Sequence, residues 1–435
     1  MTKMIHYSHF VVPIYLLLVS TSAFSYNTTL LAGQLRRSST TNHATSGRFS
    51  LSSLWASVRR SSSPKLVNVD SFGAKGDGTD DSKAFNAAWK EACASANAVL
   101  VVPKNRIYHL KPVTFAGPCR SGFTVQIDGT IVASNKPADY SKDPRHWLLF
   151  ENLQNFNVRG VGTINGNGKI WWRKSCKINT SLPCKDAPTA LTFLNCKNLG
   201  VSGIRSRNAQ QMHITFQKCV NVKAWNLGVF APGNSPNTDG IHVTGTQNIA
   251  ITNSVIKTGD DCISIVSGSS NVNVMDITCG PGHGISIGSL GKGNSEAIVS
   301  GVFVNRAILT GTTNGVRIKT WQGGSGYAKN VRFQNIIMNN VSNPIIIDQN
   351  YCDQEKACQK QGSAVQVQNV LYRNIKGTSA SETAIKLDCS NSFPCKQIQL
   401  QNINLARVSV KNKGKASCFN IKGLTTWGRV SPNCS

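Results

Sequence analysis

Short runs in which apolar and polar residues alternate recur along the chain from about residue 125 to its end. Residues 249–256 and 262–266 are two such runs, and both are rich in Ile and Val. An alternation with a period of two is typical of a β-strand that buries one face. The pattern therefore predicts many short strands, each buried on one side.

A polar residue, usually Asn, begins each of these units. The units begin at Asn155, Asn198, Asn221, Asn248, Asn271, Glu296, Asn330, Asn369 and Gln397. The four steps that follow Asn198 are 23, 27, 23 and 25 residues long. Asn suits a tight corner because its amide can bond the backbone and because it tolerates left-handed dihedral angles. Repeats of this length with several strands each predict a parallel β-helix, a solenoid whose coils bury their faces against one another.

An antiparallel sandwich is the alternative that the alternation leaves open. Hairpin signals such as Asn-Gly between strands are few, which weighs against it. Before the repeats, residues 82–94 have a helical pattern, with Asp81 as the N-cap and Phe85, Ala88 and Trp89 on one face. A lone helix is a natural cap for the exposed end of stacked strands. We therefore predict an all-β fold with an N-terminal helical cap.

The first 64 residues differ from the rest of the chain. Residues 1–25 have the apolar run and the small-residue end of a signal peptide. A membrane anchor is the alternative, but Pro13 interrupts the run, which is too short to span a bilayer comfortably. Residues 26–64 are rich in Ser and Thr and contain no Asp or Glu, which predicts a flexible or removable leader. Residues 65–435 would form the β-helix.

The chain is strongly basic, with 47 Lys and Arg against 20 Asp and Glu and a formal net charge of +27. Such a charge attracts polyanions. The basic residues form no nuclear-type cluster, and no zinc-finger or aromatic RNA-binding signature occurs, so nucleic acid is not the expected partner. For an exported protein, an acidic polysaccharide is the partner that the charge favours.

The 14 cysteines agree with an oxidising compartment. Zinc binding is the competing interpretation, but no CxxC pair or Cys/His cluster has ligand spacing. Three bridges are expected, Cys352 with Cys358, Cys389 with Cys395, and Cys262 with Cys279. Sequons that permit N-glycosylation occur at Asn27, Asn179 and Asn340.

Four short segments carry the candidate chemistry. They are residues 237–240 (Asn-Thr-Asp-Gly), 259–261 (Gly-Asp-Asp), 282–284 (Gly-His-Gly) and 317–319 (Arg-Ile-Lys). Asp239 precedes Asp260 by 21 residues, and His283 follows Asp261 by 22. These steps resemble the period of the coil, so the segments would stack on one wall. Carboxylates, an imidazole and cations would then meet, which is what hydrolysis of an acidic glycoside needs.

Three carboxylates at close quarters repel one another, so at least one is expected to stay protonated at the working pH. A solvated turn is a reasonable alternative for Asp239 alone, because Asp-Gly is a common turn. Calcium binding by the cluster is another alternative. The neighbouring cations and the imidazole argue against a dication there, so we expect no metal and no other cofactor.

In this order, the four segments resemble the plant polygalacturonase family of glycoside hydrolases. The resemblance is carried by residues 235–242, 258–262, 280–289 and 317–321, and it extends from about Val67 to the C-terminus. It implies a right-handed parallel β-helix, secreted to the cell wall. It also implies hydrolysis of the α-1,4 linkages of galacturonan, the acidic backbone of pectin, without a metal cofactor.

The resemblance also assigns roles to the reactive residues. Asp260 would be the general acid that protonates the glycosidic oxygen. Asp239 and Asp261 would hold and deprotonate the attacking water, with inversion at the anomeric carbon. His283 would support the protonation state and orientation of the acid.

Substrate contacts are expected from four further residues. Arg317 and Lys319 lie two apart on a predicted strand, so both point to one face and could bind a sugar carboxylate. Tyr351 and Asn237 match substrate-contacting residues of the family, although Asn237 could instead only shape its turn. Sugar subsites and ordinary packing are equally open for Trp321, Trp171 and Trp172.

Two other functions stay open at this point. One is an inactive β-helix that binds the cell wall, and the other is a β-helical lyase that uses calcium. Among hydrolases, the match to plant-type endo enzymes and the lack of a large insertion near the site favour endo over exo attack. We expect a monomer that is not attached to a membrane after cleavage of the signal peptide.

Overall fold

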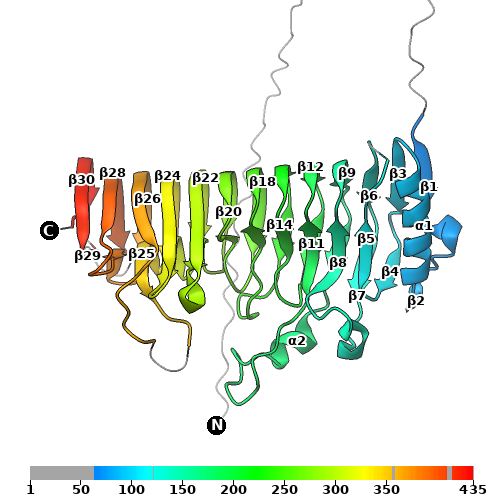
Figure 1. The fold of residues 1–435 in the computed structure, drawn as a ribbon, viewed down its shortest axis with the longest axis horizontal. Helices are drawn as coiled ribbons and strands as arrows, with labels where there is room; N and C mark the ends of the chain where they lie inside the picture. Colours follow the sequence, from blue (N-terminus) through cyan, green and yellow to red (C-terminus); the bar gives the residue numbers. More distant parts are fainter. Residues whose placement is uncertain (1–62, 121, 355–357, 409–413, 435) are drawn as a thin grey trace, which may run out of the picture. The chain divides into compact units, whose positions relative to one another are not determined.

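The computed structural model describes residues 63–434 apart from 121, 355–357 and 409–413 (Figure 1). The predicted signal peptide and almost all of the predicted leader lie outside these residues. Among the described residues, no helix is long and apolar enough to cross a membrane.

The described part of the chain is a right-handed parallel β-helix whose strands form two large sheets (Figure 1). Every pairing between named strands in the described residues is parallel, for example β17 (Ile241–Thr244) with β19 (Ile263–Ile265). This confirms the predicted solenoid and rules out the antiparallel sandwich.

The strands of the 11-stranded sheet stack in chain order, whereas the 19-stranded sheet contains two stacks of strands that merge into one part-way along the solenoid. The 11-stranded sheet contains β5 (Val113–Ala116), β8 (His146–Glu151), β11 (Thr189–Leu194), β14 (Ile214–Gln217), β17 (Ile241–Thr244), β19 (Ile263–Ile265), β21 (Ile285–Leu290), β23 (Asn314–Trp321), β25 (Asn343–Tyr351), β27 (Thr383–Asp388) and β29 (Lys415–Phe419). The 19-stranded sheet contains β1 (Lys65–Asn68), β2 (Asp77–Asp80), β3 (Ala98–Val102), β4 (Ile107–Leu110), β6 (Thr124–Ile127), β7 (Thr130–Ala133), β9 (Gln154–Arg159), β10 (Thr163–Asn165), β12 (Lys197–Ser202), β13 (Arg205–Arg207), β15 (Val220–Trp225), β16 (Gly228–Phe230), β18 (Gln247–Lys257), β20 (Ser270–Cys279), β22 (Glu296–Thr310), β24 (Ser325–Val341), β26 (Gln366–Ser379), β28 (Cys395–Arg407) and β30 (Ile421–Ser431). The short helices are α1 (Ser82–Ala94), α2 (Lys169–Arg173), η2 (Val69–Phe72), η3 (Pro137–Tyr140) and η4 (Lys292–Asn294).

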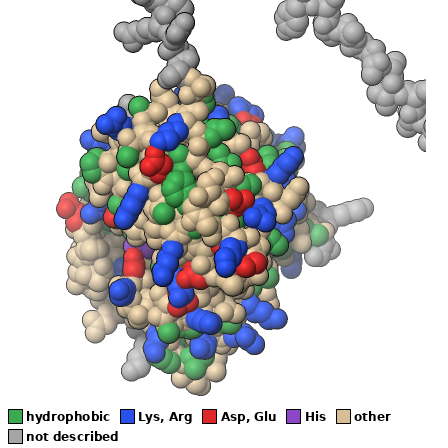
Figure 2. Space-filling view, turned by 90° about the vertical axis from the view of Figure 1, so that its right-hand side faces the viewer, with side chains coloured by type: hydrophobic (Ala, Val, Ile, Leu, Met, Phe, Trp, Pro, Cys, Tyr) green, Lys and Arg blue, Asp and Glu red, His purple; other side chains and the backbone are tan. Residues whose placement is uncertain are grey.

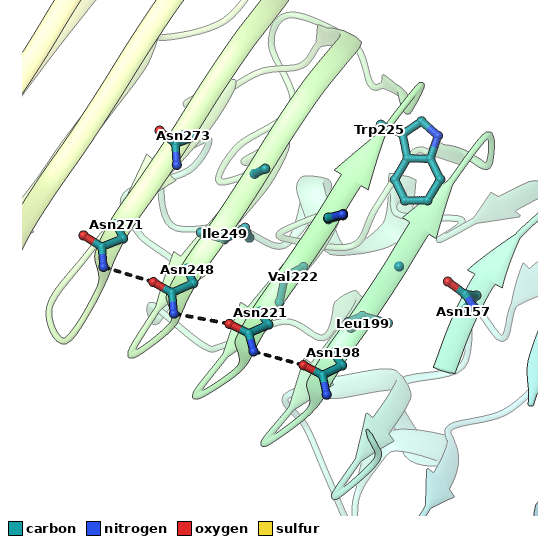
Figure 3. Close-up of a pocket in the computed structure, with 13 residues that line it drawn as sticks. Asn157, Asn198, Leu199, Asn221, Val222, Trp225, Asn248, Ile249, Asn271 and Asn273 are labelled. Atoms are coloured by element: carbon teal, nitrogen blue, oxygen red, sulfur yellow. Dashed lines mark hydrogen bonds between the residues drawn. The ribbon is translucent and has the colours of Figure 1, made fainter. Parts of the chain in front are cut away.

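The recurring asparagines stand at one corner of the coil, as predicted (Figure 3). Asn198, Asn221, Asn248 and Asn271 have φ between 51° and 58°, the left-handed region that Asn tolerates better than most residues. Each side-chain amide donates a hydrogen bond to the amide oxygen one coil earlier, at 3.0 to 3.2 Å within this set. The corner thus satisfies its own polar groups while the backbone turns.

The predicted start of the next unit, Glu296, is wrong. Ser270 pairs with Ser300 and Val272 with Val302, so the residue opposite Asn271 is Gly301. Gly301 has φ of 67° and takes the left-handed conformation that Asn adopts elsewhere. Because a Gly replaces the Asn signature here, the sequence pattern pointed to a residue at the start of β22 instead.

Replacing a corner asparagine tests this explanation. We expect Asn221→Ala to lower the free energy of unfolding by about 2 kcal/mol, because Ala disfavours the left-handed region and makes no ladder bonds. Asn221→Gly should lower it by only about 1 kcal/mol, because Gly keeps the backbone conformation. Urea unfolding of both variants measures the difference, and equal losses would show that the backbone conformation is not what Asn221 supplies.

The interior of the coil is apolar and stacked in layers. Phe150, Phe193 and Phe216 lie on successive coils with ring centroids 5.3 Å apart in each neighbouring pair. All three are fully buried. Because each coil places the same kind of side chain above the last, the interior is continuous along the β-helix axis.

Helix α1 covers the N-terminal end of the solenoid with the predicted bounds, and Phe85, Ala88 and Trp89 are buried beneath it. The prediction for Asp81 is wrong in one respect, because its side chain makes no cap hydrogen bond to the helix. Its carboxylate instead accepts from the backbone N–H groups of the preceding loop, and Asp80 Oδ1 accepts from Ser82 N at 3.0 Å. Seen from this end, Lys and Arg side chains are spread over the surface among fewer acidic ones (Figure 2).

All three predicted disulfides are present, Cys262–Cys279, Cys352–Cys358 and Cys389–Cys395. Three further ones join Cys93 to Cys119, Cys176 to Cys184 and Cys418 to Cys434. Cys196 and Cys219 are buried free thiols. Two of the bridges, Cys176–Cys184 and Cys352–Cys358, close short loops that reach the site described next.

Candidate active site

The four motif segments meet on the 11-stranded sheet. Three of the reactive residues lie just before neighbouring strands. Asp239, Asp261 and His283 each stand two residues before the first residue of β17, β19 and β21, respectively. The following strand of this sheet, β23, carries Arg317 and Lys319. The repeat of the coil therefore brings these side chains to one wall, as the spacing predicted.

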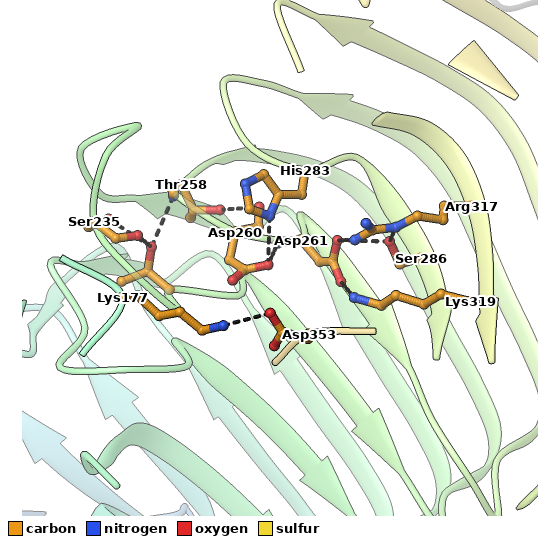
Figure 4. Close-up of polar contacts among 12 residues, drawn as sticks. Lys177, Ser235, Thr258, Asp260, Asp261, His283, Ser286, Arg317, Lys319 and Asp353 are labelled. Atoms are coloured by element: carbon orange, nitrogen blue, oxygen red, sulfur yellow. Dashed lines mark hydrogen bonds and ion pairs between the residues drawn. The ribbon is translucent and has the colours of Figure 1, made fainter. Parts of the chain in front are cut away.

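These residues line a cavity of about 590 Å³. All eight predicted site residues are among its lining, namely Asn237, Asp239, Asp260, Asp261, His283, Arg317, Lys319 and Tyr351. The structure thus brings together all eight of these residues. Figure 4 shows the central ones facing one another above the strands.

Asp261 is the most enclosed carboxylate of the site, with a side chain 2% exposed. Its Oδ1 accepts from Ser286 Oγ at 2.7 Å and from Arg317 Nη2 at 2.8 Å. Its Oδ2 accepts from Lys319 Nζ at 3.0 Å. Both oxygens are therefore bound to cations or to a hydroxyl, which compensates for the loss of water around the charge.

Asp260 is paired with the imidazole. Its Oδ1 lies 3.0 Å from His283 Nδ1 and accepts from the backbone N–H of Asp261 at 2.8 Å. Burial alone would raise the pKa of Asp260, but the hydrogen bond from His283 and the charges of His283 and Lys319 outweigh it, so the pKa is lowered.

The pKa of Asp239 is shifted in the opposite direction to that of Asp260. Burial, together with the charges of Asp260 and Asp261, raises its pKa well above the usual value. In the free protein, Asp239 therefore keeps a proton more readily than Asp260 does. This direction agrees with the expectation that one member of the set stays protonated, although the resemblance gives the acid role to Asp260.

Two glycines fix the position of His283. Gly282 has φ of 145° and Gly284 has φ of 85°, conformations that residues with a Cβ rarely adopt. A Cβ on Gly284 would lie 2.1 Å from the carbonyl oxygen of Asn314 on the next coil. The Gly-His-Gly segment thus permits the tight turn that brings the ring to the carboxylates.

The family model described as "Glycosyl hydrolases family 28" matches residues 93–431. The chain belongs to glycosyl hydrolases family 28. It is 62% identical over 376 residues to "Polygalacturonase QRT2" of Arabidopsis thaliana, covering 86% of this chain and 85% of that one. It is 60% identical over 373 residues to "Polygalacturonase-2" of Solanum lycopersicum, covering 85% and 81%.

Solved structures share the fold of this family 28 chain at low sequence identity. An exopolygalacturonase from Thermotoga maritima has a TM-score of 0.68 at 20% identity, covering 84% of this chain and 92% of that one. An endo-xylogalacturonan hydrolase from Aspergillus tubingensis has a TM-score of 0.70 at 22% identity, covering 83% and 99%. Exo-acting and endo-acting enzymes therefore share the architecture, and the fold does not separate the two modes.

The aromatic candidates of the family 28 site divide into one lining residue and three packed ones. Tyr351 lines the cavity, and its ring centroid lies 5.4 Å from Lys319 Nζ. Trp321 is buried behind it in an edge-to-face contact. Trp171 packs edge-to-face on Tyr140, and Trp172 Nε1 donates to Ala209 O at 3.0 Å. These tryptophans therefore pack against the protein and do not line the cavity.

Asn237 is positioned for both roles that the sequence left open. Its φ of 55° places it in the left-handed region, so it shapes the turn before Asp239. It also lines the cavity. The two interpretations are therefore compatible.

Three polar residues of the site were missed by the sequence analysis. His242, Ser264 and Ser286 pair in register across β17, β19 and β21, and Ser286 pairs with Arg317. Ser264 Oγ lies 2.7 Å from His242 Nδ1, and burial lowers the pKa of His242 to about 4. Each lies three residues after Asp239, Asp261 or His283. Extending the repeat step from the motif residues would have identified them.

Three residues of the site could together contact a metal ion, because Asp260, Asp261 and His283 each have one potential ligand atom within 4.8 Å of the others. A cation bound there would be repelled by Arg317 and Lys319, which already bind Asp261. Hard divalent cations such as Ca²⁺ prefer six to eight oxygen ligands. The donor set therefore fits Ca²⁺ poorly.

Proposed function

We propose that this family 28 protein hydrolyses the α-1,4-galacturonosyl linkages of polygalacturonate, the acidic backbone of pectin. The observation that carries the proposal is the meeting of three carboxylates, His283 and two cations in one cavity. Relatives called polygalacturonase that are 60% identical or more over most of the chain support the same substrate.

In this proposal, Asp260 is the general acid, and Asp239 and Asp261 hold and deprotonate the attacking water. The hydrogen bond between Asp260 and His283 supports a role for the imidazole in setting the protonation of the acid. Because the carboxyl groups interact, the three of them titrate together and share their protons. In the free protein the proton lies preferentially on Asp239, and in this proposal it lies on Asp260 when the substrate is bound.

We propose inversion at the anomeric carbon on the resemblance to the family. The ligand atoms of Asp260 and Asp261 lie within 4.8 Å of each other. The carboxyl groups of most inverting glycosidases are about 6.5–9.5 Å apart. The stereochemistry therefore does not follow from that distance rule here.

Substrate binding in this proposal rests on Arg317, Lys319, Tyr351 and Asn237. Arg317 and Lys319 carry positive charge into the cavity, which favours a uronate over a neutral sugar. The ring of Tyr351 could stack on a sugar face, and Asn237 could donate from its amide.

We further propose that the enzyme is secreted to the cell wall and is a monomer. We propose that it cleaves internal linkages of the pectin chain, which is endo attack. The six disulfides support an oxidising compartment. Endo attack rests on the similarity to plant enzymes and on the lack of a large insertion beside the motifs.

Product analysis of the purified protein on polygalacturonate tests the proposal. New reducing ends without ultraviolet absorbance from a double bond indicate hydrolysis, and absorbance would indicate the lyase. Products of intermediate length early in the reaction indicate endo attack, and monomer alone would indicate exo attack. Binding without any product would support the inactive wall-binding protein.

Chelation gives an independent prediction. We expect activity to survive thorough treatment with EDTA, because acid and base catalysis by carboxyl groups needs no metal. In addition, the side chains of Arg317 and Lys319 already bind Asp261. Activity with and without EDTA is compared, followed by addition of calcium. Loss with EDTA and recovery with calcium would overturn the metal-free mechanism.

A further inference from the structure

An ion pair outside the carboxylate cluster joins two walls of the same cavity. Lys177 Nζ lies 2.6 Å from Asp353 Oδ1, and both residues line the cavity with Asp260 and Asp261. Figure 4 shows the pair beside the cluster. None of the roles proposed above uses either residue.

The two residues come from distant parts of the solenoid. Lys177 lies in the segment that leads into β11, and Asp353 follows β25. In the sheet, five strands separate β11 from β25, including β17, β19 and β21 of the site. Because all these strands are parallel, one loop belongs to the edge where strands begin and the other to the edge where they end. The contact therefore ties together loops from opposite edges of the sheet.

Each partner is anchored but the contact itself is weak. Lys177 follows Cys176, which is bridged to Cys184, and Asp353 follows Cys352, which is bridged to Cys358. Such bridges limit the freedom of the short loops. The two side chains are 44% and 48% exposed, and ion pairs of this exposure contribute little stability. The loops are thus held in place while the contact between them is easily broken.

Lys177 also differs from the other cations of the cavity. Among the described lining residues, Lys177, Arg317 and Lys319 are the only Lys or Arg side chains. Arg317 and Lys319 are fixed on the buried Asp261, whereas the partner of Lys177 is half-exposed. A carboxylate that enters the cavity therefore competes most easily for Lys177.

We propose that the Lys177–Asp353 pair is a clasp across the groove, which the carboxylates of an acidic polysaccharide open by taking the place of Asp353 on Lys177. Lys177 is then a further uronate-binding residue, and Asp353 is the group with which the substrate competes. The proposal rests on the proposed function for its substrate, because a neutral glycan would not displace Asp353.

Substitutions on each side of the clasp test it. Asp353→Asn removes the competitor and should lower KM for polygalacturonate about two- to fivefold, with kcat little changed. Lys177→Gln should raise KM about two- to fivefold, and the double variant should raise it no more than Lys177→Gln alone. The pair Lys415 and Glu382, also 2.6 Å apart and exposed, gives matched controls of the same charge change, and Lys415→Gln and Glu382→Gln should leave KM unaltered.

Binding of hexagalacturonate by calorimetry, in proteins that also carry Asp260→Asn, separates the clasp from the activity. A lower Kd for Asp353→Asn together with a higher Kd for Lys177→Gln supports the clasp. This holds even if the unmodified protein releases no product, and in that case only the proposed function fails. Equal weakening by both substitutions would overturn the clasp and make the pair a structural contact. Unchanged Kd in both, or no binding by any form, would overturn it as well.

Discussion

Asp260→Asn should give a folded protein that still binds oligogalacturonate but hydrolyses polygalacturonate about 10²- to 10⁴-fold more slowly, the usual contribution of a general acid. The amide keeps the shape of the carboxyl and can still meet His283 Nδ1, which lies 3.0 Å from Asp260 Oδ1. It cannot give a proton to the leaving oxygen. Measurement of kcat, with Kd for a short oligomer, separates loss of chemistry from loss of binding.

A substrate with an activated leaving group tells the acid from the base. Such a leaving group needs little protonation, so Asp260→Asn should lose much less activity on it than on the polymer, whereas Asp239→Asn should lose activity on both. The opposite pattern would give the acid role to Asp239, whose raised pKa already favours a proton in the free protein. Asp276→Asn, at an exposed aspartate paired with Arg306, is the control and should leave both rates unchanged.

Lys319→Met should lower the free energy of unfolding by about 3 kcal/mol, because loss of one partner leaves a buried carboxylate incompletely compensated. Lys319 Nζ lies 3.0 Å from Asp261 Oδ2, and both side chains are at most 10% exposed. We also expect a large fall in kcat, because Asp261 would no longer be held in place. Denaturant unfolding and kinetics on polygalacturonate measure the two effects.

Two further variants control this experiment. Lys386→Met removes a cation from β27, two strands away from β23 in the same sheet, where its partner Asp388 is 3.5 Å away and partly exposed, and should cost at most about 1 kcal/mol. Adding Asp261→Asn to Lys319→Met should recover stability without recovering activity, because the buried charge is gone. A higher KM with unchanged stability for Lys319→Met would show that Lys319 serves only the substrate, as the sequence alone had suggested.

The sequence by itself was enough to predict the architecture and the central charged residues of the site. Alternation of apolar residues and the Asn corners are local properties that each coil repeats, so the parallel solenoid could be read from them. The near-equal steps between Asp239, Asp261 and His283 then placed these side chains on one wall, because the coil returns the chain to the same face. The apolar face of residues 82–94 likewise identified the capping helix.

The tertiary structure alone decided which charges meet. Arg317 and Lys319 were expected to face a sugar carboxylate, but their nearest partner is Asp261, 56 and 58 residues earlier. The Lys177–Asp353 contact joins residues 176 positions apart, through loops whose lengths do not follow the repeat. A periodic sequence fixes the register of the coils. Packing in three dimensions decides how far side chains and irregular loops extend from one coil to another. It also sets the balance of burial and charge that separates the pKa of Asp239 from that of Asp260.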